Sequence, residues 1–395
     1  MADAGVVIGL PESHSAGGDV VFHLKIGRRN LTDDHGAIGL IFAIVVGSGV
    51  LFGLLAISVD VGNIYTERRV VQNAADVAAV SGAMQCAKNE CTQVTVQNLM
   101  TGYTNPSSPD LKTSVSALCI KQPASAGCPA VGSKALDCRA VPSTLSKYVR
   151  VYTRSLDPSG SSLLIPWISN AIATSINSGT TVTACSQAAW GTVKTVPVYY
   201  PFALPACGYS EDADQNFKEL PSTNSGETRW AGCAVTDHDN QLKQFPSSPT
   251  GFVQVTLPGV SGCEVSTAVS IGQVLQINTA NDQHLCGSAQ TAIPSLLRML
   301  EQPRYIPVVD AGTSNTVTVR FFVQFRLKAF YYAKTGYPNV APYNTSTFWN
   351  NQIPSCNNKA GKDCLYGLFE PAVYPGGEID PNAPALGIQA VRPLP

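Results

Sequence analysis

The chain has 395 residues, a length that accommodates a tail, a membrane anchor and one or two domains. Charged residues make up 13% of it and the formal net charge is −1, so the composition gives no support for binding of nucleic acid or of another anionic partner. All 12 cysteines lie downstream of the most apolar stretch. An even number of cysteines on one side of such a stretch indicates disulfides in an oxidising compartment.

The first 59 residues predict a tail followed by a membrane span. Residues 1–31 contain short apolar pieces broken by Gly and Pro, and we expect a largely disordered cytoplasmic tail. Thr32, Asp33 and Asp34 offer a helix cap and acidic side chains for a first turn. Residues 37–59 carry no charge and, at about 1.5 Å per residue, are long enough to cross a hydrocarbon core of about 30 Å. They predict a transmembrane helix.

Asp60 marks the predicted exit into water, but no Pro follows it, so we expect one long helix over 32–88 that ends near Ala87. Small residues recur at a spacing of four along this helix. This spacing lets transmembrane helices pack together, and outside the membrane it lets another element approach closely. The predicted packing positions are Gly39, Ala43, Gly47, Gly49 and Gly53 in the span, and Ala74, Ala75, Ala78, Ala79, Gly82 and Ala83 beyond it.

Two sequence motifs carry a family resemblance. The apolar run opens with DHGAIGLIFAIVV and is followed by AISVDVGNIYTERRVVQNAADVAAVSGA. Residues 36–83 are thereby similar to the N-terminal module of TadE/TadG-like proteins of the Tad (Flp, type IVc) pilus system. Residues 182–207, VTACSQAAWGTVKTVPVYYPFALPAC, resemble the actinobacterial members. The resemblance implies a membrane-anchored, pilin-like or pilus-assembly protein with its bulk outside the cytoplasm, and it implies no catalytic residues.

The apolar run leaves two processing events open. Ala56 and Ser58 fit a signal-peptidase site, but the run is longer than a usual signal core and begins only after residue 36. Prepilin-type cleavage after Gly36 is the other option. Leu40 and Ile41 occupy the neighbourhood where prepilins carry an acidic residue. The basic residues on the two sides of the span give only a slight bias, so the cysteine placement predicts a cytoplasmic N-terminus.

The rest of the chain predicts an α+β fold. Residues 89–190 predict a pilin-like unit in which the alanine-lined helix packs on an antiparallel sheet, and residues 191–395 predict a second, β-rich, disulfide-linked part. In the first part we expect a short helix over 92–103, an irregular segment over 105–140, a strand over 148–154 with Val149 and Val151 inward, a helix over 163–177 and a strand over 181–190. In the second we expect strands over 193–200, 252–257 and 316–332, a helix over 292–301 and a loop-rich end.

Disulfide connectivity cannot be deduced from sequence. Sequence separation motivates four hypotheses, two for short loops and two for longer ones. The proposed pairs are Cys86–Cys91, Cys356–Cys364, Cys207–Cys233 and Cys263–Cys286.

No motif predicts catalysis, a cofactor or a metal site. His238 and His284 are the only histidines after the span, the chain has no G-x-S-x-G motif, and we interpret His238 as a solvated loop residue. No CxxC pair exists, and Glu211, Asp212 and Asp214 predict an exposed acidic turn. Residues 157–161, DPSGS, fit the metal-site signature of von Willebrand factor A-type domains but are more typical of a turn.

The sequence therefore predicts a single-pass membrane protein that works as a non-enzymatic structural or assembly component of a Tad-type surface pilus. Its expected partners are the membrane and other pilus subunits, contacted through helix packing, with homo-oligomerisation as a further option. A membrane-tethered extracellular binding module unrelated to a filament is the alternative, and an anchored hydrolase is the third class.

Overall fold

In the computed structural model the chain divides into two compact units, Met1–Ile57 and Ser58–Pro395. All structural statements below refer to the described residues. These are 35–92, 95–99, 113–122, 138–156, 181–209, 218–221, 230–249, 251–257, 266–278, 289–300, 302–311, 315–331 and 363–395.

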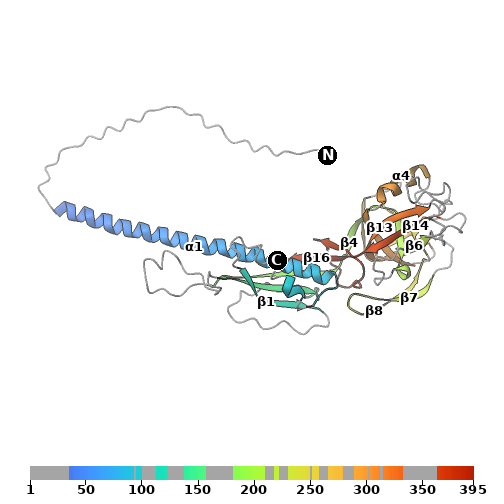
Figure 1. Ribbon diagram of the computed structural model, residues 1–395, viewed down its shortest axis with the longest axis horizontal. Coiled ribbons are helices and arrows are strands. Elements are labelled where there is room, and N and C mark those ends of the chain that lie inside the picture. The colour runs from blue at the N-terminus through green and yellow to red at the C-terminus, as the bar shows by residue number, and fades with distance from the viewer. Residues whose placement is uncertain are drawn as a thin grey trace, which may run out of the picture. The chain divides into compact units, whose positions relative to one another are not determined.

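Helix α1, His35–Ala87, is the long blue helix of Figure 1 and ends where the sequence predicts. Among the described residues, its stretch Gly39–Ala87 contains the one segment that is long and apolar enough to cross a membrane. The large apolar side chains whose burial is described in the first unit are exposed, with Leu40 at 65% and Phe42 at 70%. Asp60, the predicted exit into water, is only 7% exposed and is therefore covered by protein.

In the second unit, α1 packs against a five-stranded sheet. Its order is β1-β2-β3-β16-β15, and every pairing is antiparallel except that of β15 with β16. The predicted strands over 148–154 and 181–190 are confirmed as β2 and β3. The five strands are β1 Thr113–Lys121, β2 Tyr148–Ser155, β3 Thr183–Thr192, β16 Gln389–Leu394 and β15 Val373–Pro375.

Strand β1 corrects the prediction of an irregular segment over 105–140. A bulge between Val115 and Ala117 interrupts the alternation that would have indicated a strand. Pairing with β2 nevertheless organises the segment, and Leu118 and Cys119 become buried. Strand β16 likewise comes from the end predicted to be loop-rich, and it joins β3 in the first sheet.

A second, larger sheet has seven strands in the order β11-β9-β5-β12-β13-β14-β6. Because β11 also pairs with β13, five of these strands close into a ring of pairings, β11-β9-β5-β12-β13. Two smaller sheets join β4 to β10 and β7 to β8. The elements are β4 Thr195–Val198, β5 Phe202–Pro205, η1 Ala206–Gly208, β6 Lys218–Pro221, β7 Trp230–Thr236, β8 Leu242–Ser248, β9 Val253–Thr256, β10 Thr267–Ser270, β11 Val274–Ile277, α4 Ala289–Met299, β12 Pro303–Ala311, β13 Thr316–Tyr331 and β14 Cys364–Glu370.

Strand β13 serves two hydrophobic cores. Val319 and Phe322 belong to one core, and Phe321 belongs to the other. The switch occurs at Arg320, which has no partner in β12 because Val309 pairs with Val319 and the next pair skips one residue. An extra residue reverses the faces that later side chains point to, so one strand feeds both cores.

The remaining predictions of secondary structure have mixed outcomes. The strands over 252–257 and 316–332 and the helix over 292–301 are confirmed as β9, β13 and α4. The strand over 193–200 is shorter than predicted, and of the helix over 92–103 the structure describes residues 95–99 as helical, capped by Thr92 Oγ1. Thr32–Asp34 and the helix over 163–177 lie outside the described residues. The observed elements make the chain α+β.

Replacement of Gly387 by Ala should destabilise the second unit by at least about 3 kcal/mol. Its φ of +64° is left-handed, and a β-carbon would clash with the Phe322 carbonyl oxygen and lie 2.9 Å from Phe321 Cδ2. Chemical denaturation of the full chain in detergent measures the loss. Gly376→Ala is the control, because its φ of +74° is similar but its surroundings are open, and it should cost only about 1 kcal/mol. Equal losses in the two variants would contradict the packing described.

Candidate functional site

The outer half of α1 carries its small residues on a buried face. Ala75, Ala78, Ala79 and Ala83 have no exposed surface. They form two clusters with valines of β2, alanines of β3 and Val391 of β16. Since the helix and the sheet both present short side chains here, their backbones approach closely.

Hydrogen bonds complement this contact. Thr153 Oγ1, in β2, donates to the Val71 carbonyl of the helix over 2.9 Å. Gln72 Nε2 donates to the Cys185 carbonyl of β3 over 3.1 Å. Thr153 is fully buried, so its hydroxyl would be left without a partner if the helix moved away.

The sequence analysis predicted that the small residues beyond the span let another element approach closely, and the sheet of the same chain packs there. Ala75, Ala78, Ala79 and Ala83 pack with residues of the sheet, and Ala74 and Gly82 are buried as well. The six positions are Ala74, Ala75, Ala78, Ala79, Gly82 and Ala83.

The small residues of the span have different surroundings. A β-carbon added at Gly39, Gly47 or Gly53 would meet nothing within 4 Å, and Ala43 is exposed. Gly49 is helical, and its surroundings are not described. These five positions therefore stay predicted packing positions.

Disulfides stabilise the second unit at three described places. Cys86–Cys91 closes the end of α1, Cys138–Cys185 ties the segment before β2 to β3, and Cys207–Cys233 ties η1 to β7. The sequence analysis proposed the first and the third. It missed Cys138–Cys185, whose cysteines are 47 residues apart and meet because β3 pairs with β2.

Cys119 and Cys364 are also disulfide-bonded, with partners outside the described residues. We expect non-reducing peptide mapping of the purified chain to recover Cys356–Cys364 and Cys263–Cys286, since these pairs are close in sequence. Recovery of Cys364 with any other cysteine would refute the first pair, and a free thiol at Cys263 would refute the second.

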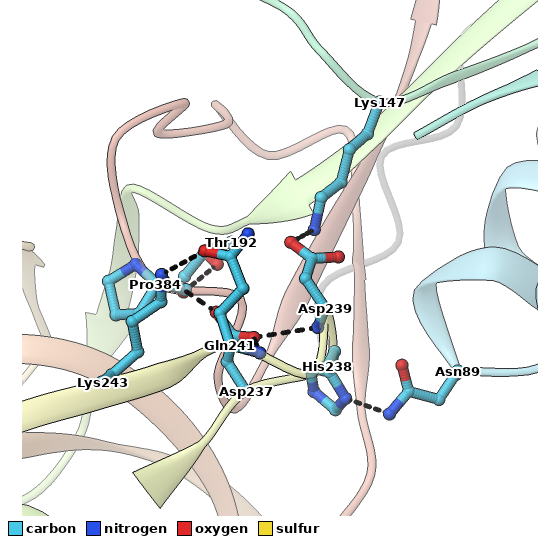
Figure 2. Close-up of polar contacts among 9 residues, drawn as sticks. All are labelled: Asn89, Lys147, Thr192, Asp237, His238, Asp239, Gln241, Lys243 and Pro384. Carbon is cyan, nitrogen blue, oxygen red and sulfur yellow. Dashed lines mark hydrogen bonds and ion pairs between the residues drawn. The ribbon is translucent and has the colours of Figure 1, made fainter. Parts of the chain in front are cut away.

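A polar turn between β7 and β8 joins several segments of the second unit (Figure 2). Asp237 Oδ1 accepts hydrogen bonds from the backbone nitrogens of Asp239 and Gln241 over 3.0 and 2.9 Å, which fixes the turn. Lys147, just before β2, places Nζ 2.5 Å from Asp239 Oδ2, and Lys243 places its Nζ 3.4 Å from the nearly buried Asp237. The ion pair between Lys147 and Asp239 thus connects the turn to the start of β2 in the five-stranded sheet.

His238 occupies the centre of this turn and corrects the interpretation of a solvated loop histidine. It is half-buried, its backbone nitrogen donates to the Ala385 carbonyl over 2.9 Å, and its Nδ1 contacts Nδ2 of Asn89 at the end of α1 (Figure 2). A donating amide beside Nδ1 fits a neutral ring, in which one nitrogen accepts.

Burial lowers the pKa of His238, and the positive charge of Lys147 lowers it further, whereas a hydrogen bond with the Gly387 backbone and the carboxylates of Asp237 and Asp239 raise it. The balance lies below the ordinary value of 6.5. The unfolded chain therefore binds a proton more readily than the folded chain. The contribution of His238 to the free energy of unfolding is fully present above about pH 6.5. It is lost as the pH falls toward the lower pKa of the folded state.

We expect the wild-type melting temperature to fall between about pH 7.5 and pH 5.5, and the fall to be smaller in His238→Gln. Glutamine keeps a polar side chain but cannot be protonated in this range. Thermal melts of the full chain followed by circular dichroism measure the difference. Other titrating groups affect both proteins equally, so identical slopes would show that His238 is not coupled to folding.

Within the described part of the chain, the other candidate sites provide neither a set of metal ligands nor a thiol nucleophile beside His238. No group of three His, Cys, Asp or Glu residues there is arranged to hold a metal ion. Cys207 and Cys233 form a disulfide, so neither is a thiol nucleophile for the nearby His238. His284, the acidic residues Glu211, Asp212 and Asp214, and residues 157–161 lie outside the described residues.

Comparison with known proteins supplies one relationship. Residues 36–85 match the family described as putative Flp pilus-assembly TadE/G-like. No curated protein and no solved structure matches the chain. The match confirms the resemblance of residues 36–83, and it lies entirely on α1. The likeness of residues 182–207 to actinobacterial members falls outside it and stays a prediction.

Proposed function

Because residues 36–85 make this chain TadE/TadG-like, we propose that it is a non-enzymatic structural or assembly component of a Tad-type surface pilus, in the manner of a minor pilin or pseudopilin. The observation that carries the proposal is the division of α1 into two kinds of surface. Its first part exposes apolar side chains, and its later part is buried against a sheet. The family match spans both parts.

The first part of α1 serves as a single membrane anchor. Large apolar side chains such as Leu40, Phe42 and Leu55 are 58% exposed or more. An exposed apolar surface of this kind is unfavourable in water and favourable in lipid. The uncharged run over 37–59 has the length that a bilayer requires.

The N-terminus lies in the cytoplasm and the second unit lies outside the cytoplasm. The disulfides support this orientation, because they persist in oxidising compartments and are rare in the cytosol. All 12 cysteines follow the span, as this orientation requires.

The later part of α1 acts as the spine of a pilin-like unit. Support comes from its packing on the antiparallel strands β2, β3 and β16 through alanines. Since these alanines are used within the chain, association with other subunits falls to the span. Gly39, Ala43, Gly47, Gly49 and Gly53 are the proposed intramembrane packing positions, in the small-residue pattern that allows close helix contact.

Purification of the tagged full chain from producing cells in a mild detergent tests the function. We expect other pilus subunits to be recovered with it, or the chain itself to appear in sheared filaments. Recovery only in the membrane fraction, without pilus subunits, would contradict this role and favour the alternative of a membrane-tethered extracellular binding module.

Replacement of Gly49 and Gly53 by Leu should reduce the recovered pilus subunits several-fold, because the added side chains hold a partner helix away. Quantitative mass spectrometry of the purified complex measures the recovery. Ile44→Phe adds bulk at an exposed position outside the rows of Gly39, Ala43 and Gly47 and of Gly49 and Gly53, and it serves as the control. Undiminished recovery with the double variant would rule out this intramembrane surface.

A further inference from the structure

The second unit contains a cavity of about 720 Å³, within the range of small-molecule sites. Its walls come from the end of α1, from β7 and the following turn, from Tyr209 after η1 and from the end of β14. We propose that this cavity binds a neutral saccharide. The proposal goes beyond the pilus role and does not depend on it.

Aromatic rings provide an apolar side of the cavity. Tyr209 and Phe369 meet edge to face, with centroids 5.2 Å apart. Tyr209 also contacts Phe321 at 5.0 Å, and the Cys207–Cys233 disulfide secures the adjoining backbone. The rings are therefore held in place before any ligand arrives, and aromatic surfaces of this kind pack against the C–H faces of sugar rings.

Two asparagines provide uncharged hydrogen-bonding groups. Asn89 and Asn240 line the cavity, and both side chains are exposed. Each amide offers donors and an acceptor, a combination that suits hydroxyl groups. Both residues have left-handed backbones, with φ of 69° and 58°, so glycine is able to replace either without backbone strain.

The acidic groups of the cavity already have protein partners. Glu370 accepts hydrogen bonds from Arg326 and, over 2.9 Å, from Gln324 Nε2. Asp237 is paired with Lys243. These carboxylates are neutralised but keep acceptor capacity, which favours a hydroxyl-rich neutral ligand over a cation.

Lys88 lines the same cavity on an exposed turn, and its ammonium is able to donate to sugar hydroxyls. Burial lowers the pKa of His238, which disfavours a positive charge on this ring, and Asn89 contacts its Nδ1. The lining therefore combines fixed aromatic rings, amides and neutralised acids, which together match the surface of an oligosaccharide.

Isothermal titration calorimetry of the full chain tests the proposal, in a detergent without a sugar head group. The probes are triacetylchitotriose and cellotriose. We expect at least one to bind. The double variant Asn89→Gly/Asn240→Gly should bind about 25-fold more weakly, because each of the two lost hydrogen bonds corresponds to a factor of about five. Lys88→Ala, at an exposed position, should also weaken binding and covers the case in which the double variant does not fold.

Asn73→Ala is the matched control, since it removes an exposed amide of α1 outside the cavity and should leave affinity unchanged. Absence of heat with both saccharides at millimolar concentration would overturn the proposal, as would binding that neither cavity variant weakens. Binding of trialanine that is sensitive to these variants, with no saccharide binding, would assign the cavity to a peptide instead. None of these outcomes bears on the recovery of pilus subunits, so the two proposals fail separately.

Discussion

The close contact between α1 and the five-stranded sheet depends on side chains that end at Cβ. Ala75, Ala79 and Ala83 lie one turn apart, and the facing strands contribute small residues such as Ala184 and Ala188. Larger side chains on either surface would separate the backbones and break the bond from Thr153 to the helix. The buried helix face is thus used for packing within its own chain.

A single strand connects the two hydrophobic cores of the β-rich region. In β13 the bulge at Arg320 changes the face on which later residues point, so that Val319 and Phe321 serve different cores. Asp310, almost fully buried in β12, receives the Arg320 guanidinium as an ion pair. The charge at the bulge is therefore neutralised where the strand departs from regular pairing.

The turn after β7 connects this β-rich region to the helix and the first sheet. Lys147 and Asn89 belong to the first part of the unit, whereas Asp239 and His238 belong to the turn, and their contacts cross between the two (Figure 2). A neutral histidine fits this position because a neighbouring ammonium and burial both disfavour its charge. Asn89 and His238 also line the cavity.

The sequence alone determined the features that depend on local periodicity. The uncharged run and the spacing of small residues predicted α1 and its end at Ala87, and alternation predicted β2, β3 and β13. Only the tertiary structure decided the features that depend on distant partners. Strand β16 completes a sheet begun at Thr113, Cys138 meets Cys185 across β2 and β3, and His238 meets Asn89 at the end of α1. These pairs are far apart along the chain, so no local pattern encodes them, and strand pairing brings them together.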